Sequence, residues 1–255
     1  MKSTKPGLTM FLATTAISAA VLTGCSPEPG SSSASGAPAP NLSPSAASAS
    51  SVPSATPDVQ AATEALVEAV NSGDAAAAES AIADGADLEV EIARGMTPVI
   101  AATKAQDTEL AIALIEAGAD VNAKDDIQDS AFLYAGAEGL NEILKASIAA
   151  GADVAATNRY GGTALIPAGE HGHVETIKIL IDAGVPLDHI NNPGWTAIHE
   201  AIVLNDGGPR QVESIRLLLE AGADPTIPDG NGTSPRQLAE DRGFTEIVQL
   251  LDQYL

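Results

Sequence analysis

The closest pair of histidines, His171 and His173, is the first place in the chain to look for metal chemistry. Imidazole nitrogens bind Zn²⁺, but a zinc site takes three or four protein ligands. Neither a cysteine nor a third histidine is clustered with this pair, and Gly172 between them suits a turn that joins two helices. We therefore predict no metal site here.

A second chemical candidate is the acidic cluster of Asp125, Asp126 and Asp129. Carboxylates could hold a cation weakly, but a 12-residue calcium loop is absent, so we expect these side chains to be solvated acids. The chain also lacks a Ser–His–Asp order, a G-x-S-x-G elbow, a P-loop and a His-Glu-x-x-His motif. We predict that the protein is not an enzyme and takes no cofactor.

Charge narrows the possible partners. The chain carries a net charge of −22, with acidic residues spread over residues 58–255 rather than gathered in one run. A solvated surface explains this pattern first, and electrostatic attraction of a basic protein partner is the alternative. Nucleic-acid binding is disfavoured because phosphate contacts need basic patches. Attraction to anionic lipid headgroups is disfavoured for the same reason.

Two markers recur in register and reveal the organisation of the chain. The first is Gly-Ala-Asp or a close variant, beginning at Gly85, Gly118, Gly151, Gly184 and Gly222. The second is a hydroxyl residue followed by Pro or Ala, at Thr97, Ser130, Thr163, Thr196 and Ser234. Both markers advance by 33, 33, 33 and 38 residues. Such a fixed period predicts a stacked array of repeats.

Each repeat is predicted to be a helix, a turn, a second helix and a long polar turn. The hydroxyl suits an N-cap, and Pro98 or Pro235 suits the first helical position. Five residues after the hydroxyl a small side chain recurs, which favours close helix packing: Ala102, Ala135, Ala168, Ala201 and Ala239. Four residues later Gly139, Gly172 and Gly243 suit a left-handed helix end.

The pattern resembles the ankyrin repeat, most closely in residues 194–201 and 212–224. The resemblance implies an all-α ankyrin-repeat solenoid, in which antiparallel helix pairs stack with hairpin-like tips projecting from them. It covers residues 58–255, in about six units of which the first is degenerate. The predicted units span 58–91, 92–124, 125–157, 158–190, 191–228 and 229–255.

The chain departs from the family pattern in four places. Only the fifth unit keeps the family's histidine, His199, to which the resemblance gives a structural role beside Thr196. Gln128 replaces the usual glycine of a tip. Pro167 removes an N–H early in a helix and is expected to distort its first turn. Five extra residues around Gly207–Pro209 are predicted to lie between the two helices of unit five.

The segment before the repeats is predicted to be a targeting device. Residues 1–24 combine a basic start with a short apolar stretch, as in a signal peptide, and residues 22–25 look like the lipobox of bacterial lipoproteins. We therefore expect lipid on Cys25, the single cysteine. Residues 25–57 continue as a disordered linker rich in Ser, Ala and Pro. Removal of Lys2 and Lys5 with the signal would take the net charge from −22 to about −24.

These observations predict an extracytoplasmic binding module, anchored in the membrane by lipid, that holds a protein partner on its tips and inner helix face. Tip positions that vary freely in the family are the predicted contacts: Arg94, Met96, Asp126, Asp129, Arg159, Tyr160, Asn192 and Trp195. Packing between neighbouring tips explains Trp195 equally well. An immunity or inhibitor role against a basic toxin or enzyme is an alternative. Similarity to other exported bacterial ankyrin proteins suggests an envelope stress role as another.

Overall fold

The computed structural model describes residues 58–255, which contain twelve α-helices, one short 3₁₀ helix and no strand. The predicted signal peptide, the lipidated Cys25 and the linker lie outside the described residues. The helices are α1 Val59–Ser72, α2 Ala75–Ala83, α3 Pro98–Lys104, α4 Thr108–Glu116, α5 Ala131–Glu138, α6 Asn141–Ala149, α7 Leu165–His171, α8 Val174–Asp182, α9 Ala197–Val203, α10 Pro209–Glu220, α11 Pro235–Asp241 and α12 Thr245–Leu251, and the 3₁₀ helix η1 is Ala93–Gly95.

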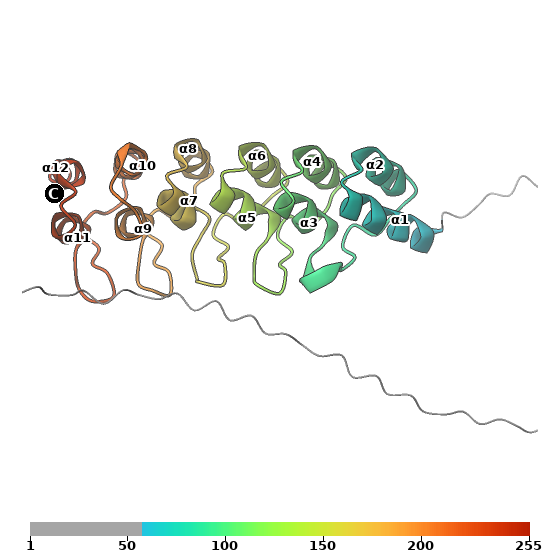
Figure 1. The fold of residues 1–255 in the computed structure, drawn as a ribbon, viewed down its shortest axis with the longest axis horizontal. Helices are drawn as coiled ribbons and strands as arrows, with labels where there is room; N and C mark the ends of the chain where they lie inside the picture. Colours follow the sequence, from blue (N-terminus) through green and yellow to red (C-terminus); the bar gives the residue numbers. More distant parts are fainter. Residues whose placement is uncertain (1–57) are drawn as a thin grey trace, which may run out of the picture. The chain divides into compact units, whose positions relative to one another are not determined.

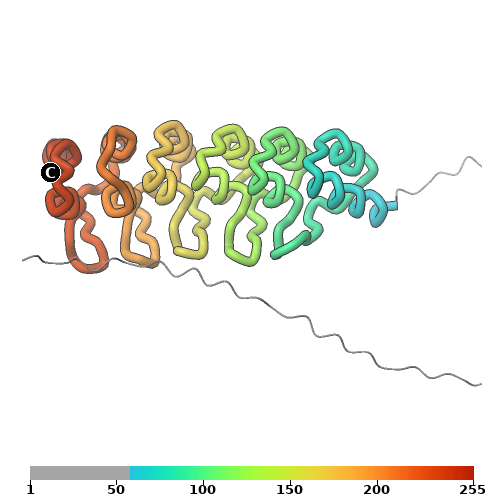
Figure 2. The backbone as a smooth tube through the Cα atoms, viewed as in Figure 1, coloured from blue at the N-terminus to red at the C-terminus, as the bar shows by residue number. Residues whose placement is uncertain are grey.

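The helices of residues 58–255 form two rows (Figure 1). The odd-numbered helices make one row and the even-numbered helices the other, and the long turns project beyond the odd-numbered row. We call each of these turns a tip, and we call the odd-numbered helices the inner helices. Figure 2 shows that the backbone repeats the same path from unit to unit. The predicted all-α ankyrin-repeat solenoid is confirmed.

Small residues set the spacing between successive inner helices. The five alanines predicted to allow close packing are all at most 1% exposed. Between α5 and α7 the approach is closer still, because a Cβ atom added to Gly136 would lie 2.7 Å from the Cβ of Ala164. A Cβ atom on Gly169 would lie 3.0 Å from the carbonyl oxygen of Ala197 in α9. Larger side chains at these positions would push the inner row apart.

The predicted hydroxyl caps are confirmed in some units and wrong in others. The hydroxyls of Ser130 and Ser234 each accept a hydrogen bond from the backbone N–H three residues on, at 3.2 Å. Thr97 makes no side-chain cap, and Thr163 is not an N-cap because α7 starts one residue late. Both threonine hydroxyl oxygens are buried and have no hydrogen-bond partner in the structure.

The fifth unit gives its threonine hydroxyl a different partner. The backbone N–H of Thr196 donates to Nδ1 of His199 at 3.1 Å, and the hydroxyl of Thr196 lies 2.9 Å from the same nitrogen. The position of this histidine is taken by Ile100 in unit two and by Ile166 in unit four. An alkyl side chain offers no acceptor, so Thr97 and Thr163 lack the imidazole partner that Thr196 has.

Two further departures act as the sequence predicted. Pro167 has no N–H to donate to the carbonyl of Thr163, which instead accepts from Ile166 in a tighter turn. The extra residues of unit five lie between α9 and α10. There Asn205 donates its amide to the carbonyl oxygen of Glu170 at 2.7 Å, so the insertion caps the last turn of α7.

A candidate binding surface on the tips and inner helices

The structure distributes the eight predicted contact residues over two pockets and the outer edge of one tip. Arg94, Met96 and Asp126 line one pocket. Three more residues line a second pocket, and these are Asp129, Arg159 and Tyr160. Asn192 is exposed and Trp195 is half-buried, and neither lines a described pocket.

Four of the five long turns are shaped by an Asp or Asn side chain at the same position, which is Ile92 in unit two. One carboxylate oxygen of Asp125 accepts from the backbone N–H groups of Ile127 and Asp129, both at 3.0 Å. Asn158 and Asp229 accept the same pair of bonds, whereas Asn191 accepts only from Trp195 because Pro193 has no N–H. This local bonding holds these four tips in one conformation, because Asp and Asn side chains mimic a backbone turn.

Neighbouring tips are also bonded to each other. The backbone N–H of Asp126 donates to the carbonyl of Arg94 at 3.1 Å, and that of Asn192 donates to the carbonyl of Tyr160 at 2.9 Å. Four of the predicted contact residues therefore meet through their backbones. Their side chains remain exposed and available to a partner.

The prediction of solvated acids is wrong for Asp125 and Asp129, whereas Asp126 is exposed as predicted. Asp125 is 4% exposed, and Nζ of Lys104 lies 2.6 Å from Asp125 and 3.0 Å from Asp129. Burial alone would raise the pKa of Asp125, but the Lys104 bond and the backbone donors outweigh it and lower the pKa. Sequence reasoning missed Lys104, since it stands 21 residues before Asp125 and one unit away.

Lys104 connects the two pockets. It lines the first, together with Arg94, Met96 and Asp126, in a cavity of about 290 Å³ whose rim includes the exposed Ile127. The ammonium group also lies 5.3 Å from the ring centroid of Tyr134, which lines the second pocket. One cation thus contacts residues that line both cavities.

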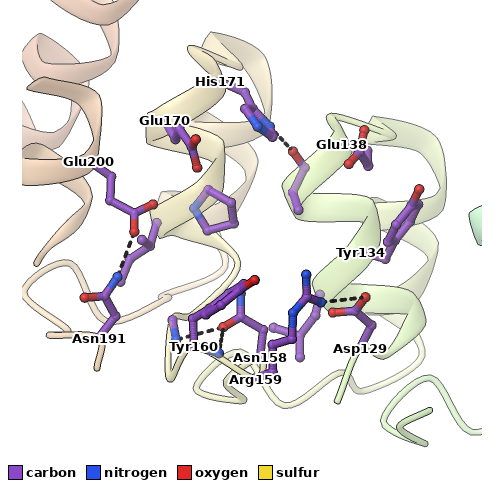
Figure 3. Close-up of a pocket in the computed structure, with 15 residues that line it drawn as sticks. Asp129, Tyr134, Glu138, Asn158, Arg159, Tyr160, Glu170, His171, Asn191 and Glu200 are labelled. Carbon is purple, nitrogen blue, oxygen red and sulfur yellow. Dashed lines mark hydrogen bonds and ion pairs between the residues drawn. The ribbon is translucent and has the colours of Figure 1, made fainter. Parts of the chain in front are cut away.

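The second pocket, of about 250 Å³, opens between three inner helices and the tips (Figure 3). We call it the acidic pocket. It is lined by residues of α5, α7, α9 and the tips that precede them: Asp129, Leu133, Tyr134, Ala137, Glu138, Asn158, Arg159, Tyr160, Gly162, Ile166, Pro167, Glu170, His171, Asn191 and Glu200. Four of these side chains are carboxylates, whereas Arg159 is the one Lys or Arg among them. Residues of three successive repeat units therefore line one cavity.

The arginine that lines the acidic pocket, Arg159, lies at the mouth of the pocket, where it is exposed. Arg159 lies over the ring of Tyr160, 4.6 Å from the centroid, and its NH1 atom is 3.7 Å from a carboxylate oxygen of Asp129. Both Arg159 and Tyr160 are exposed. An exposed arginine stacked on an exposed tyrosine is a common composition for a protein interface.

Glu200 is the most buried carboxylate of the acidic pocket. It is 9% exposed, and one carboxylate oxygen accepts from Nδ2 of Asn191 at 2.7 Å. Burial raises the pKa of Glu200 to about 7, and the negative charge of Glu170 adds to the shift. The Asn191 bond and His171 act in the opposite direction but do not cancel it. This carboxylate therefore changes its charge near neutral pH.

Sequence reasoning missed both Glu170 and Glu200. Glu170 stands seven residues after Thr163, and Glu200 stands four residues after Thr196, so the two occupy different positions of the repeat. A charge in the middle of α9, between the buried His199 and Ala201, was the available signal for Glu200. Glu170 gave none, because a charge near a helix end is usually solvated.

His199 has the structural role that the resemblance implied. Its ring is fully buried, and Nδ1 accepts from the backbone of Thr196. Burial lowers the pKa of His199, with Asp229 opposing that shift. The indole of Trp195 stands one residue before this cap, and its backbone bonds Asn191 within the tip.

Among residues 58–255, no group of three or more His, Cys, Asp or Glu side chains is placed to hold a metal ion. In the same part of the chain, no helix is long and apolar enough to cross a membrane.

Comparison with known proteins agrees with the geometry. Family models described as "Ankyrin repeats (3 copies)" and "Ankyrin repeat" match residues 132–229 and 94–126. The ankyrin repeat protein YahD of Escherichia coli (strain K12) is 58% identical over 52 residues, which are 20% of this chain and 26% of that protein. The chain thus aligns with about a quarter of the length of this relative.

Solved structures match over most of the described residues. An ankyrin repeat domain from Acinetobacter baumannii AYE is 47% identical with a TM-score of 0.72, covering 74% of this chain and 96% of that chain. The ankyrin repeat protein EF0377 is 39% identical with a TM-score of 0.73, over 76% of this chain and 98% of that chain. The ankyrin repeat domain of Bcl-3, at 21% identity, shares the fold with a TM-score of 0.64, over 73% of this chain and 81% of that chain. The family models and the two relatives of 39–47% identity cover the residues that form the repeated helix pairs. The chain therefore belongs to the ankyrin repeat family.

Proposed function

We propose that this protein is a binding module that holds a protein partner across its tips and inner helices and performs no chemistry of its own. Ankyrin repeat domains generally bind protein partners, and they generally act as interaction modules rather than as enzymes. The observation that carries the proposal is the pair of pockets between the tips and the inner helices. Six of the eight predicted contact residues line them.

The proposed binding surface is already ordered before a partner arrives. Asp or Asn bonds hold four of the tips, and Lys104 on α3 bonds two aspartates of the tip that precedes α5. A partner therefore need not supply the free energy that ordering a loop would cost. Exposed groups that can anchor it are Tyr160, Arg159 and Ile127.

A second part of the proposal concerns location. The basic start, the apolar stretch and the lipobox of residues 1–25 support an extracytoplasmic module held on the bacterial membrane by lipid at Cys25. The replacement Cys25→Ala should abolish lipidation and leave the protein in the soluble exported fraction or unprocessed. A mutant that stays membrane-bound after a carbonate wash, with unchanged mobility, would refute the lipoprotein assignment.

The binding surface is tested by crosslinking the protein to its partner in the intact envelope and then measuring the affinity of the purified pair. Tyr160→Ala and Trp195→Ala should each weaken binding, by about 2 kcal/mol or more for a buried anchor. Tyr254→Ala is the matched control, since Tyr254 is also exposed but lies at the far end of the chain, beyond α12. Full affinity in both tip variants would remove the tips from the binding site, and a lower melting temperature alone would assign Trp195 to tip packing.

A further inference from the structure

The acidic pocket holds more negative charge than the chain itself neutralises. Arg159 pairs with Asp129 at the mouth. Within residues 58–255, no Lys or Arg side chain lies at ion-pair distance from the remaining three carboxylates, Glu138, Glu170 and Glu200. The chain as a whole is acidic, with a net charge of −22. What distinguishes these three carboxylates is that they line one cavity together.

Two of these carboxylates line the cavity from neighbouring inner helices. Glu200 from α9 and Glu170 from α7 both face the cavity, and the charge of Glu170 penalises ionisation of Glu200 (Figure 3). Glu200 is nine-tenths buried, and its one side-chain hydrogen bond in the structure is the donation from Asn191 to a single oxygen. The other oxygen has no protein partner. A cation that entered the pocket would bond this oxygen and offset the repulsion.

The walls of the pocket select the kind of cation. Its lining joins carboxylates to the apolar side chains of Leu133, Ile166 and Pro167 and to the ring of Tyr134. Arginine and lysine have the matching construction, an apolar stem that ends in a charged head. The volume of about 250 Å³ corresponds to about eight water molecules in the liquid. It therefore has room for such a head and stem.

We propose that the acidic pocket receives one cationic side chain, arginine or lysine, of a basic protein partner, with its head between Glu170 and Glu200 and its stem against Ile166 and Pro167. This inference rests on the proposed function, because the cation is supplied by the protein that the tips bind. The inference adds to the proposed function the kind of side chain that the partner must present. The net charge of −22 would assist the approach of such a partner from a distance.

The test uses short peptides as probes and needs no knowledge of the partner. The full chain, labelled with ¹⁵N, is titrated with acetyl-Gly-Arg-Gly-amide and with the same peptide carrying citrulline, a neutral side chain of nearly the same shape. A lysine peptide is the third probe. Chemical shifts of the Asn191 side-chain amide and of the Glu200 backbone amide report on the pocket. We expect the arginine or the lysine peptide to bind at least tenfold more tightly than the citrulline peptide.

Variants locate the binding. Glu170→Gln and Glu200→Gln should each reduce the affinity for the cationic peptide about threefold to tenfold. Glu109→Gln removes the same charge from an exposed position on α4 and should leave the affinity unchanged within twofold. Equal losses in all three variants would mean a general effect of net charge and would overturn the site. Equal binding of the arginine, lysine and citrulline peptides would overturn it as well.

The two proposals can fail separately. If the peptides do not discriminate but Tyr160→Ala still weakens the crosslinked partner, the tip surface stands and the cation pocket is wrong. If the peptides bind as expected while the tip variants keep full affinity for the partner, the pocket is a cation site and the proposed surface is wrong.

Discussion

At the scale of single residues, one side chain decides whether a buried threonine is stabilising. Thr97 and Thr196 hold the same place in their repeats, with extended backbone at both N-caps. The Thr196 hydroxyl has the imidazole of His199 beside it, whereas the Thr97 hydroxyl has the alkyl chain of Ile100. A buried hydroxyl without a hydrogen bond destabilises the folded state.

This contrast predicts opposite results from one substitution. Thr97→Val removes an unpartnered hydroxyl at nearly constant shape and should raise stability by about 1 kcal/mol. Thr196→Val breaks the bond to His199 and should lower stability by a similar amount. Thermal unfolding should show shifts of about 2–4 °C in opposite directions. Two shifts of the same sign would show that the hydroxyl bond is not what distinguishes the sites.

The pKa of Glu200 predicts a dependence of stability on pH. Because its folded pKa of about 7 is raised above the usual 4.5, the folded state favours the protonated form. The resulting stability is present below pH 4.5 and is lost as pH rises through 7. The neutral variant Glu200→Gln keeps an acceptor for Asn191 and avoids this loss. Its stability relative to the parent protein should therefore grow by about 1–2 kcal/mol between pH 5.5 and pH 8, after allowance for solvent screening.

The comparison must be made as a difference at each pH. The pKa values of His199 and His173 are lowered by burial, so their contribution is lost as pH falls, opposite to that of Glu200. Both histidines are present in the parent and in the variant, and their effect cancels. A difference in melting temperature that stays constant from pH 5.5 to pH 8 would contradict the assignment to Glu200.

The individual residues of the candidate site were the hardest part to predict from the sequence. Tip residues such as Arg159 and Tyr160 could be proposed because the family exposes these positions. The acidic pocket could not, since Glu138, Glu170 and Glu200 are 32 and 30 residues apart and each alone is an ordinary helix charge. Only the stacking of α5, α7 and α9 brings them together.

At the scale of the elements, the helix ends follow from backbone conformation. The turn after the first helix takes a left-handed residue, glycine at Gly139, Gly172 and Gly243, as predicted. Unit two has Gln106 in the same place, with φ of 58°, and Gln128 takes a left-handed position in a tip with φ of 65°. A side chain with a Cβ atom is strained there.

These positions predict that glycine will stabilise the protein. Gln106→Gly and Gln128→Gly should each raise stability by about 1 kcal/mol, because glycine adopts positive φ without steric cost. Gly243→Gln is the matched reverse change, since no atom lies within 4 Å of where its Cβ would be and only the backbone effect is measured. Chemical denaturation checks all three variants. A gain from Gly243→Gln would show that the left-handed strain is not the controlling factor.

The helices themselves were predictable, because the 33-residue period and the residues typical of helix ends place the helix boundaries at the same positions. The 33-residue spacing and the distortion before Pro167 could be read directly, since each depends on the residues of one unit. The late start of α7 at Leu165 shows the limit. The hydroxyl of Thr163 predicts an N-cap. Because Pro167 has no N–H, the carbonyl of Thr163 accepts from Ile166 instead, and the first turn is tighter than the prediction assumed.

At the scale of the whole array, the end unit protects the units before it. In unit six, α11 packs on α9 and α12 packs on α10. The solvent side of this unit is polar, with Gln249, Asp252 and Gln253 exposed. Such a terminal unit keeps the apolar interior of its neighbour away from water.

Deletion of residues 229–255 should therefore cause aggregation or a clearly lower melting temperature. The apolar residues of α9 and α10 that unit six covers would become exposed. Deletion of residues 253–255 alone is the control, since all three are exposed and follow the last helix. A 229–255 deletion with an unaltered melting curve would argue against a continuous stack.

The repeating contacts also have a consequence for how the chain folds. Every strong contact between two of the twelve helices joins members of the same unit or of adjacent units. The polypeptide therefore closes only short loops on its way to the native state, and short loops cost little entropy. Folding can begin at any pair of neighbouring units and spread in both directions. A ribosome that has released two repeats has already supplied a complete folding nucleus, and each later repeat needs only the surface of the one before it.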